Sequence, residues 1–396
     1  MAILNFTGFE TGSSTYPDYG ASGLLGTASS YSTSGPRTGS YAMRVNRSST
    51  QEGYIDFNQL SANGLFAALT GYANIYVGAA YRFVSFPAIE EVIMHVQGSG
   101  VNKSRITINS SGQVSIRDVA HTLIVTGNTR IPLGTYVYIE VRVGTGVTGN
   151  YEIKINEVIE VSGTANFGVN NTDSVLVGTH EDMNGGGFEY FVDDAYLSDS
   201  DFLSSGSYVP AVSLLVPNAA GDSAGWTNGT GSTFAEVDEI PPESDGADAS
   251  YIQASAAQDN TYSAFNVQAP FSMGISNGIH SVKGMVVCRT TSTSGNSTVS
   301  LRMRLSATNS DTTGKELILG YDVLQKLHNT SFVSALAWTI TDLESLQIGM
   351  SAAAIGQVQR FTAAYIMVLH SILIDPVPGR PYGRIGQSQM QQLIVQ

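Results

Sequence analysis

Short segments in which apolar and polar residues alternate, separated by turn residues, recur along most of this chain and constrain its fold more than any other feature. The clearest is 136–143, where valine and isoleucine face one way while Tyr138, Glu140 and Arg142 face the other. Many strands of this kind at short spacing are typical of a β-sandwich. Residues 341–344 (TDLE) resemble a capping box that begins a single short helix. We therefore predict an all-β protein.

Length and composition agree with that class. The chain has 396 residues, 42 of them glycine, and charged residues make up 13%, about half the usual share. Such a chain is long enough for two domains, each with its own core. We predict two tandem β-sandwich (jelly-roll) domains, at 1–205 and 212–375. A linker at 206–211 joins them, and an extended C-terminal docking arm follows at 376–396.

The charge and cysteine content exclude several classes of protein. A net charge of −14 argues against nucleic-acid binding, which needs clustered Lys and Arg. The only cysteine, Cys288, excludes an intrachain disulfide and fits assembly in a reducing cytoplasm. We find neither a secretory leader nor an apolar run long enough to cross a bilayer, and so expect no membrane partner.

Residues 187–199 (GFEYFVDDAYLSD) follow two further glycines and form the predicted closing strand, in which either Ala195 or Tyr196 continues the buried face. This segment resembles the last strand of laminin-G-like, or concanavalin-like, jelly rolls. The resemblance implies that the closing strand lies beside the first strand, Ile3 to Phe9. That family often has Asn-Gly at a hairpin where this chain has Asn156-Glu157.

Longer stretches extend the resemblance to tailed bacteriophages. PLGTYVYIEVRV, GNYEIKINEVIEVSG and SVLVGTH are similar to laminin-G-like domains of tailed-phage proteins, and LLVPNAAGDSAGWT and LAWTITDLESLQIGM resemble a module of tailed-phage virion proteins. The resemblance implies a non-enzymatic structural component of the virion, a decoration or fibre-like protein on head, collar or tail. Its partners would be other virion proteins and further copies of itself, with a trimer favoured. It would lie on the virion surface after assembly in the host cytoplasm.

The alternative is a host-receptor recognition protein that binds, or cleaves, cell-surface glycans. Laminin-G-like sandwiches often bind glycans, and exposed aromatic rings can stack on sugars. Tyr16, Tyr19 and Tyr31 lie in or beside a polar loop and are candidate glycan-binding residues, although ordinary turn packing also explains them. Trp226 and Trp338 are more simply interpreted as core or edge residues.

No catalytic residue is predicted. Residues 236–239 (EVDE) resemble the acidic strand of concanavalin-like glucanases, but Ile240 takes the position where the next acid belongs and Pro241-Pro242 ends the strand. The sequence has no Gly-x-Ser-x-Gly motif for a serine hydrolase, and its six histidines form no evident constellation. We therefore expect no enzyme, and no cofactor other than a structural calcium ion.

Acidic residues near the closing strand are the candidate calcium ligands. Asp193 and Asp194, with Glu181 and Asp182, would contribute carboxylate oxygens at one edge of the first sandwich. In the laminin-G-like family such aspartate pairs are frequently structural and cap loops by side-chain hydrogen bonds. No second histidine stands at metal-ligand spacing near His180, which argues against zinc.

The C-terminal segment 376–396 contains three prolines, two arginines and no acidic residue. It is too short to form its own core, and we predict that it either adds a strand to a neighbouring subunit or folds back on its own domain. The candidate docking residues are Pro378, Arg380, Tyr382, Arg384, Leu393 and Val395.

Overall fold

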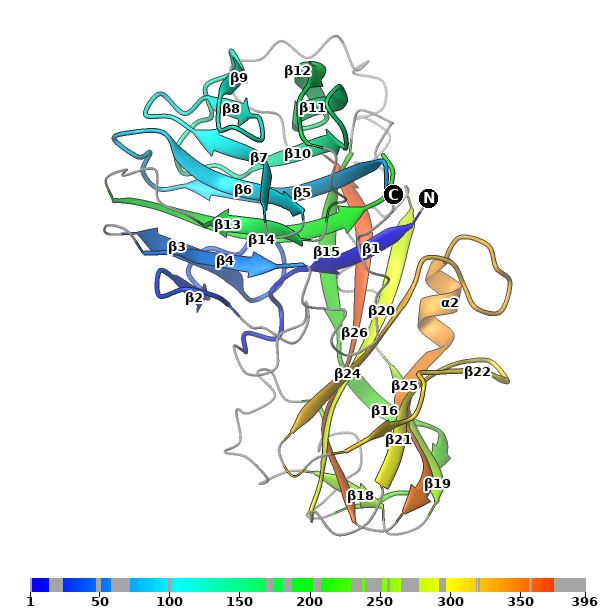
Figure 1. Cartoon of the computed structure of the whole chain (residues 1–396). Coiled ribbons are helices and arrows are strands. Elements are labelled where there is room, and N and C mark those ends of the chain that lie inside the picture. Colours follow the sequence, from blue (N-terminus) through cyan, green and yellow to red (C-terminus); the bar gives the residue numbers. More distant parts are fainter. Residues whose placement is uncertain are drawn as a thin grey trace, which may run out of the picture.

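A computed structural model gives the fold of the chain (Figure 1). The residues that the structure describes are 2–13, 24–47, 51–57, 72–98, 101–168, 172, 174–180, 187–201, 208–228, 237–238, 251–254, 257–264, 278–291, 297–317, 319, 321–355 and 358–373. Their secondary structure consists of strands and one short helix, α2 (Ile340–Ser345), so the predicted all-β sandwich class is confirmed. Among these residues no helix is long and apolar enough to span a membrane.

Two antiparallel sheets form the first sandwich, in the upper half of Figure 1. Sheet A has the order β12-β11-β10-β5-β14-β3-β2, with β1 also paired to β14. Its strands are β1 (Ile3–Thr7), β2 (Ser29–Ser32), β3 (Ala42–Arg47), β5 (Asn74–Phe83), β10 (Val137–Gly144), β11 (Gly149–Ile155), β12 (Val158–Ala165) and β14 (Phe188–Ser198). Sheet B has the order β4 (Gly53–Asp56), β13 (Ser174–Thr179), β6 (Glu91–Gly98), β7 (Val101–Ile108), β8 (Val114–Arg117) and β9 (Leu123–Thr126). Their facing side chains make the first apolar core.

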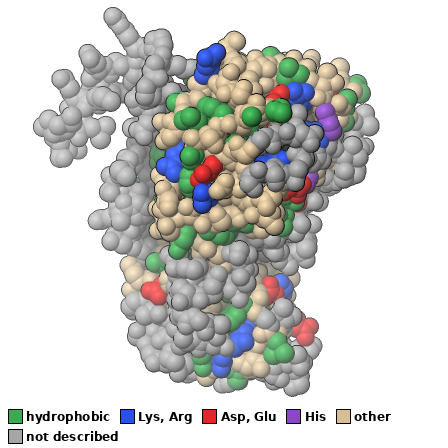
Figure 2. All heavy atoms as spheres, turned by 90° about the vertical axis from the view of Figure 1, so that its left-hand side faces the viewer, with side chains coloured by type: hydrophobic (Ala, Val, Ile, Leu, Met, Phe, Trp, Pro, Cys, Tyr) green, Lys and Arg blue, Asp and Glu red, His purple; other side chains and the backbone are tan. Residues whose placement is uncertain are grey.

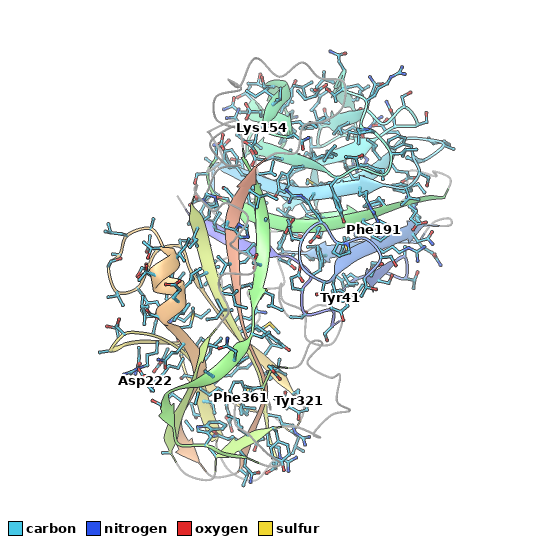
Figure 3. All side chains as sticks on the ribbon, turned by 180° about the vertical axis from the view of Figure 1, so that it is seen from behind. Tyr41, Lys154, Phe191, Asp222, Tyr321 and Phe361 are labelled. Atoms are coloured by element: carbon cyan, nitrogen blue, oxygen red, sulfur yellow. The ribbon has the colours of Figure 1, made fainter. Side chains whose placement is uncertain are left out.

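Two further sheets form the second sandwich, in the lower half of Figure 1. Sheet C has the order β17 (Thr227–Asn228), β18 (Ile252–Ala254), β26 (Gln359–Leu373), β20 (Ile279–Thr290) and β24 (Asp322–His328), with β15 (Tyr208–Leu215) also paired to β26. Sheet D has the order β16 (Pro217–Ala224), β19 (Gln258–Ala264), β25 (Leu346–Ile355), β21 (Ser297–Leu305) and β22 (Thr308–Asp311), with β23 (Lys315–Glu316) also paired to β21. The core between them includes Phe361, which is labelled in Figure 3.

The predicted closing strand is β14, and it pairs with β1 as the family resemblance implied. A β-bulge interrupts its pairing with β5 between Asp193 and Tyr196. Asp194 has a φ of 47°, a left-handed conformation that is uncommon for a residue other than glycine. Beyond the bulge Ala195 packs in the first core, whereas Tyr196 belongs to a different buried cluster on the other face of sheet A. One strand therefore contributes to two buried surfaces.

The second sandwich covers that other face of sheet A. A group of buried apolar residues, here called the junction cluster, joins the two sandwiches. Its members are Ile3, Phe6, Ala80, Tyr138, Tyr196, Val209, Val212, Met285, Val287, Ala363, Tyr365, Met367 and Leu369. Residues 208–211 of the predicted linker lie in β15, a strand of this junction, and the domain boundaries otherwise stay predictions.

Hydrogen bonds to Asp194 connect the two sandwiches beside this cluster. Arg37 Nη1 donates to Asp194 Oδ2 at 2.6 Å and to the Pro210 carbonyl oxygen at 2.7 Å. Asp194 Oδ1 accepts from the Thr38 hydroxyl and from the Val212 backbone N–H, both at 2.7 Å. This buried carboxylate therefore connects β14 of the first sandwich to β15 of the second.

Helix α2 begins earlier than predicted. Its N-cap is Thr339, whose hydroxyl accepts from the Asp342 N–H while the Asp342 carboxylate accepts from the Thr339 N–H. The prediction of Thr341 as the cap with Glu344 as its partner is wrong. Aspartate at the third helical position completes the same reciprocal box from Thr339, so the helix starts there.

The hairpin between β11 and β12 turns at Asn156 and Glu157, whose φ values are 48° and 65°. Positive φ at both central residues is the geometry of a type I′ turn, which matches the twist of the paired strands. The turn places the Glu157 carboxyl group near the buried carboxylate of Glu140, whose charge acts on it. Lys154, labelled in Figure 3, forms an ion pair with Glu140 at 3.0 Å.

Replacing Glu157 with glutamine is expected to stabilise the protein at alkaline pH. Burial, followed by the charge of Glu140, raises the pKa of Glu157 to about 8. Because the folded protein holds this proton more tightly than the unfolded chain, its contribution to stability is complete below pH 4.5 and is lost as the pH rises through 8. At pH 9 we expect Glu157→Gln to gain on the order of 2–4 kcal/mol in unfolding free energy. Thermal unfolding at pH 5 and pH 9 measures this, and equal stability of the two proteins at pH 9 would contradict it.

Candidate functional site: the outer face of sheet B

The outer face of sheet B carries a group of polar and aromatic side chains. Along β4, Ile55 packs in the first core, so the neighbouring Tyr54 and Asp56 point outward. Along β13, Val175 and Val177 pack in the same core. Figure 2 shows histidine, acidic and basic side chains close together at the right-hand side of the upper sandwich.

Strand register aligns outward positions into one row across sheet B, here called the cross-strand row. From β4 to β9 the row is Asp56, Leu176, His95, Arg105, Arg117 and Leu123. Its acidic residue lies on β4, at one edge of the sheet, and its two arginines lie on β7 and β8. The row is therefore electrically asymmetric from one side of the sheet to the other.

A second feature, here called the His–Tyr cluster, lies beside this row and consists of Tyr54, His95, Gln97 and His180. The ring centroids of Tyr54 and His180 are 4.6 Å apart, and the rings are nearly perpendicular at 88°. The rings of His95 and His180 are 5.6 Å apart. Gln97 Nε2 lies 3.5 Å from His95 Nδ1. Strands β4 and β6 and the end of β13 thus bring three rings and one amide together.

Burial sets the protonation of this cluster. It lowers the pKa of His180, although the carboxylates of Glu52 and Asp56 act in the opposite direction. Burial and the same two carboxylates raise the pKa of Tyr54. Both side chains are therefore neutral near pH 7, so the imidazole can accept a proton and the phenol can donate one.

The two ring nitrogens of His180 have different surroundings. Its Nε2 lies 4.0 Å from Glu52 Oε1. Its Nδ1 is buried and has no hydrogen-bond partner among the described residues. The side chain keeps 19% of its surface exposed, so a ligand can reach it.

Arg117, at the other end of the row, is held by Glu90. Arg117 Nε donates to Glu90 Oε1 at 3.1 Å, and Nη2 donates to Oε2 at 2.5 Å. Burial acts to raise the pKa of Glu90, but hydrogen bonds from Arg117 and Thr107 lower it. Arg117 Nη1 also donates to the carbonyl oxygen of His121 at 2.9 Å. These contacts fix the plane of the guanidinium on the face of the sheet.

The predicted calcium ligands Asp193 and Asp194 lie away from this face, at the bulge of β14. Asp193 Oδ2 accepts from the Arg37 backbone N–H at 2.7 Å, and Asp194 makes the junction contacts described above. Glu181 and Asp182 lie outside the described residues, so the four-residue calcium site stays a prediction. Within the part of the chain that the structure describes, no group of three or more His, Cys, Asp or Glu residues is arranged to hold a metal ion.

The remaining predicted residues are placed only in part. Tyr31 lies in β2, and its ring packs edge-on against Phe9 at 6.4 Å, beside the first core. Trp226 and Trp338 are buried in the second core, as predicted. The other predicted positions lie outside the described residues, namely Tyr16, Tyr19, Pro378, Arg380, Tyr382, Arg384, Leu393 and Val395.

Sequence interpretation missed the His–Tyr cluster. The expectation that the histidines form no constellation is wrong for His95 and His180, whose rings are neighbours. A usable signal is present in β6, where the polar residues His95 and Gln97 alternate with Val96 of the first core, although His95 is itself fully buried. The pairing of β6 with β13, which brings His180 alongside, cannot be obtained from that local pattern.

No protein-family model and no curated protein sequence matches this chain. Among solved structures it is similar to an endo-β-1,4-glucuronan lyase from the fungus Trichoderma reesei, with 14% identity and a TM-score of 0.34 over 44% of this chain and 88% of the lyase. It is also similar to the alginate lyase AlgAT5 of polysaccharide lyase family 7, with 10% identity and a TM-score of 0.31 over 40% of this chain and 77% of that one. A Trypanosoma rangeli sialidase in complex with sialic acid has 9% identity and a TM-score of 0.36 over 52% of this chain and 32% of that one. Likeness at this level describes a shared sandwich architecture and assigns no activity.

The prediction of a non-enzymatic virion structural protein is corrected by this comparison. The similar structures named above are carbohydrate-active enzymes, and none of them is a virion component. The structural role in a virion is therefore withdrawn.

Proposed function

We propose that the first sandwich binds a glycan on the outer face of sheet B. The observation that carries this proposal is the His–Tyr cluster, in which three strands bring rings and an amide together on one face of a rigid sheet. Sites built on strands hold their side chains more firmly than sites built on loops. The architecture shared with carbohydrate-active enzymes is consistent with this proposal but does not carry it.

The cluster has the chemical groups that sugar recognition needs. The Tyr54 ring offers an apolar surface and a hydroxyl group, and the Gln97 amide can both donate and accept hydrogen bonds. The carboxylates of Glu52 and Asp56, which act on His180, can accept hydrogen bonds from sugar hydroxyl groups. The site therefore combines one stacking surface with donors and acceptors for a hydroxyl-rich ligand.

Cleavage of the bound glycan is a second candidate function. It is favoured by the contact between a neutral imidazole and a neutral phenol at 4.6 Å. His180 would accept the proton from the carbon next to a sugar carboxylate, and the electron pair of that C–H bond would form a carbon–carbon double bond as the glycosidic C–O bond breaks. Tyr54 would donate its proton to the departing glycosidic oxygen. General acid–base catalysis of this kind contributes roughly 10²- to 10⁴-fold to a rate.

Substitutions in the His–Tyr cluster test both functions. Incubated with soluble polysaccharides, the native protein is expected to bind at least one polymer in affinity electrophoresis. Tyr54→Phe should keep the stacking surface and most of the binding but lose roughly 10²- to 10⁴-fold in any cleavage rate, because the phenolic proton is gone. His180→Ala should weaken binding and abolish cleavage. Release of reducing ends measures the cleavage.

Tyr76→Phe is the matched control, because Tyr76 lies in β5 of sheet A. It should behave as the native protein in both assays. Retention of full binding and cleavage by Tyr54→Phe and His180→Ala would place the glycan site elsewhere. Binding without cleavage by the native protein would support the first function and reject the second.

A further inference from the structure

Strand β12 is the last strand of sheet A and presents one open edge. It pairs with β11 on one side, and within the described part of the chain no strand pairs with its other side. Ser162, Gly163 and Thr164 of this strand are all exposed. The N–H and C=O groups along such an edge are directed outward and can pair with another strand. In Figure 1, β12 lies at the top of the first sandwich.

The C-terminal part of this edge lacks the features that commonly prevent strand pairing. Segment 161–165 (VSGTA) contains neither proline nor a charged residue. The one charged residue of β12 is Glu160, which accepts hydrogen bonds from the Thr129 N–H at 2.6 Å and from its hydroxyl at 2.5 Å. The bulge of β12 also lies at Glu160, so the register with β11 is regular from Val161 onward. The segment is therefore a regular, uncharged and accessible edge.

This segment is complementary to itself about a two-fold axis through Gly163. Two copies paired antiparallel about this axis place Ser162 opposite Thr164 and Val161 opposite Ala165, with Gly163 opposite itself. Each pair joins residues an even number of positions apart, so the outward backbone groups of one copy meet the outward groups of the other. Serine and threonine form favourable cross-strand pairs, and no like charges are opposed. The segment thus fits a second copy of itself.

Exposed apolar side chains at the two ends of the β11–β12 hairpin fit the same symmetry. Val158 and Ile159 are 44% and 56% exposed at the end where the hairpin turns, and Val147 is 62% exposed in the loop before β11. A two-fold axis reverses the strand direction, so the turn end of one copy lies beside the loop end of the other. Pairing therefore brings apolar surfaces together at both ends of the contact.

We infer that β12 pairs with β12 of a second copy of this chain, antiparallel about Gly163, and joins the two copies of sheet A into one continuous sheet. The contact is isologous, so it closes with two copies and forms a dimer. A contact along one strand is smaller than the roughly 800 Å² per partner of a typical stable interface, and we therefore expect the dimer to dissociate on dilution.

The dimer leaves the His–Tyr cluster of each copy accessible. Strand β9 lies beside β12, whereas β4, which carries Tyr54, lies beside β2 at the other end of sheet A. The inference does not depend on the proposed glycan binding. If both hold, the dimer presents two glycan sites, which raises its avidity for a polymer.

Sedimentation equilibrium over a range of protein concentrations measures the association. The native protein is expected to form a dimer that becomes tighter at high salt, because two chains of net charge −14 repel each other. Ser162→Lys combined with Thr164→Lys places lysines opposite each other twice across the axis. It should raise the dimer dissociation constant about tenfold, although it makes the net charge less negative.

Ser162→Lys combined with Thr164→Glu is the matched variant. It places each lysine opposite a glutamate of the other copy and should dimerise at least as tightly as the native protein. Thr308→Lys is the control, because Thr308 is an exposed residue of β22, the end strand of sheet D. It should dimerise as the native protein does. Circular dichroism confirms that each variant is folded.

A native protein that stays monomeric at every concentration would overturn the inference. So would a trimer, because this contact closes with two copies. Equal dissociation constants for the two double variants would show that the strands do not meet in this register. Dissociation of Thr308→Lys as extensive as that of Ser162→Lys with Thr164→Lys would place the interface elsewhere.

Discussion

Replacing Asp194 with alanine is expected to destabilise the protein by about 3–5 kcal/mol and to separate the unfolding of the two sandwiches. The carboxylate is fully buried and accepts hydrogen bonds from Arg37, Thr38 and Val212. Its removal leaves the largely buried Arg37 guanidinium without this carboxylate partner and the buried Val212 N–H without its acceptor, which costs far more than the loss of an exposed pair. Because the donors belong to both sides of the junction, the second sandwich loses part of its attachment to the first.

Fluorescence can follow the second sandwich alone. The chain has two tryptophans, and both lie in the second core. Circular dichroism reports the strands of both sandwiches. In chemical denaturation we expect the two signals to coincide for the native protein and to diverge for Asp194→Ala. Asp194→Asn is the matched control, since it keeps an acceptor oxygen and should lose less stability. Coincident transitions at the native midpoint in Asp194→Ala would show that the junction does not depend on this carboxylate.

Acidification from pH 6.5 to 4 is expected to destabilise the second sandwich by several kcal/mol. Burial lowers the pKa of His280, His328 and His370 to about 4 in each case, and the charge of Lys326 adds to this for His328. The unfolded chain takes up protons near pH 6.5, whereas the folded protein resists them until about pH 4. The stability that these neutral histidines contribute is therefore present above pH 6.5 and is lost as the pH falls through 4. Each group contributes roughly 2–3 kcal/mol after allowance for its partial exposure.

The measurement is the tryptophan-detected unfolding free energy at pH 7, 6 and 5, a range above the ordinary pKa of carboxylates. His280→Gln keeps a polar group near Ser371, its hydrogen-bond partner, and should make the decline with pH shallower. His121→Gln changes an exposed histidine of the first sandwich and should alter the decline less than His280→Gln does. Parallel curves for the native protein and His280→Gln would contradict the assignment of the acid sensitivity to the buried histidines.

Local patterns were enough to predict the fold class and the inner faces of the strands. Val137, Ile139 and Val141 pack in the first core as the alternation predicted. The same pattern placed Tyr138 and Glu140 toward solvent, yet each is only 2% exposed. The second sandwich covers this face of sheet A at Tyr138, and no local pattern in the sequence of β10 predicts that contact.

The candidate site was harder to predict than the fold, because its residues are distant in sequence and come together through strand pairing. His95 and Arg105 are cross-strand partners in a hairpin, so local reasoning could have paired them. Tyr54 and His180 reach the same face only because β13 is inserted between β4 and β6. Alternation along a strand predicts which face of the sheet each residue occupies, whereas the order of strands in a sheet depends on long-range contacts.

The bulge at Asp194 constrains the evolution of this protein. Val192 before the bulge and Ala195 after it both pack in the first core, whereas Tyr196 belongs to the junction cluster. An insertion or deletion of one residue on either side would reverse which side chains meet the second sandwich. Exchange of either sandwich for a homologous one must therefore preserve both the length of β14 and the apolar surface that it meets, so we expect the two sandwiches to vary together.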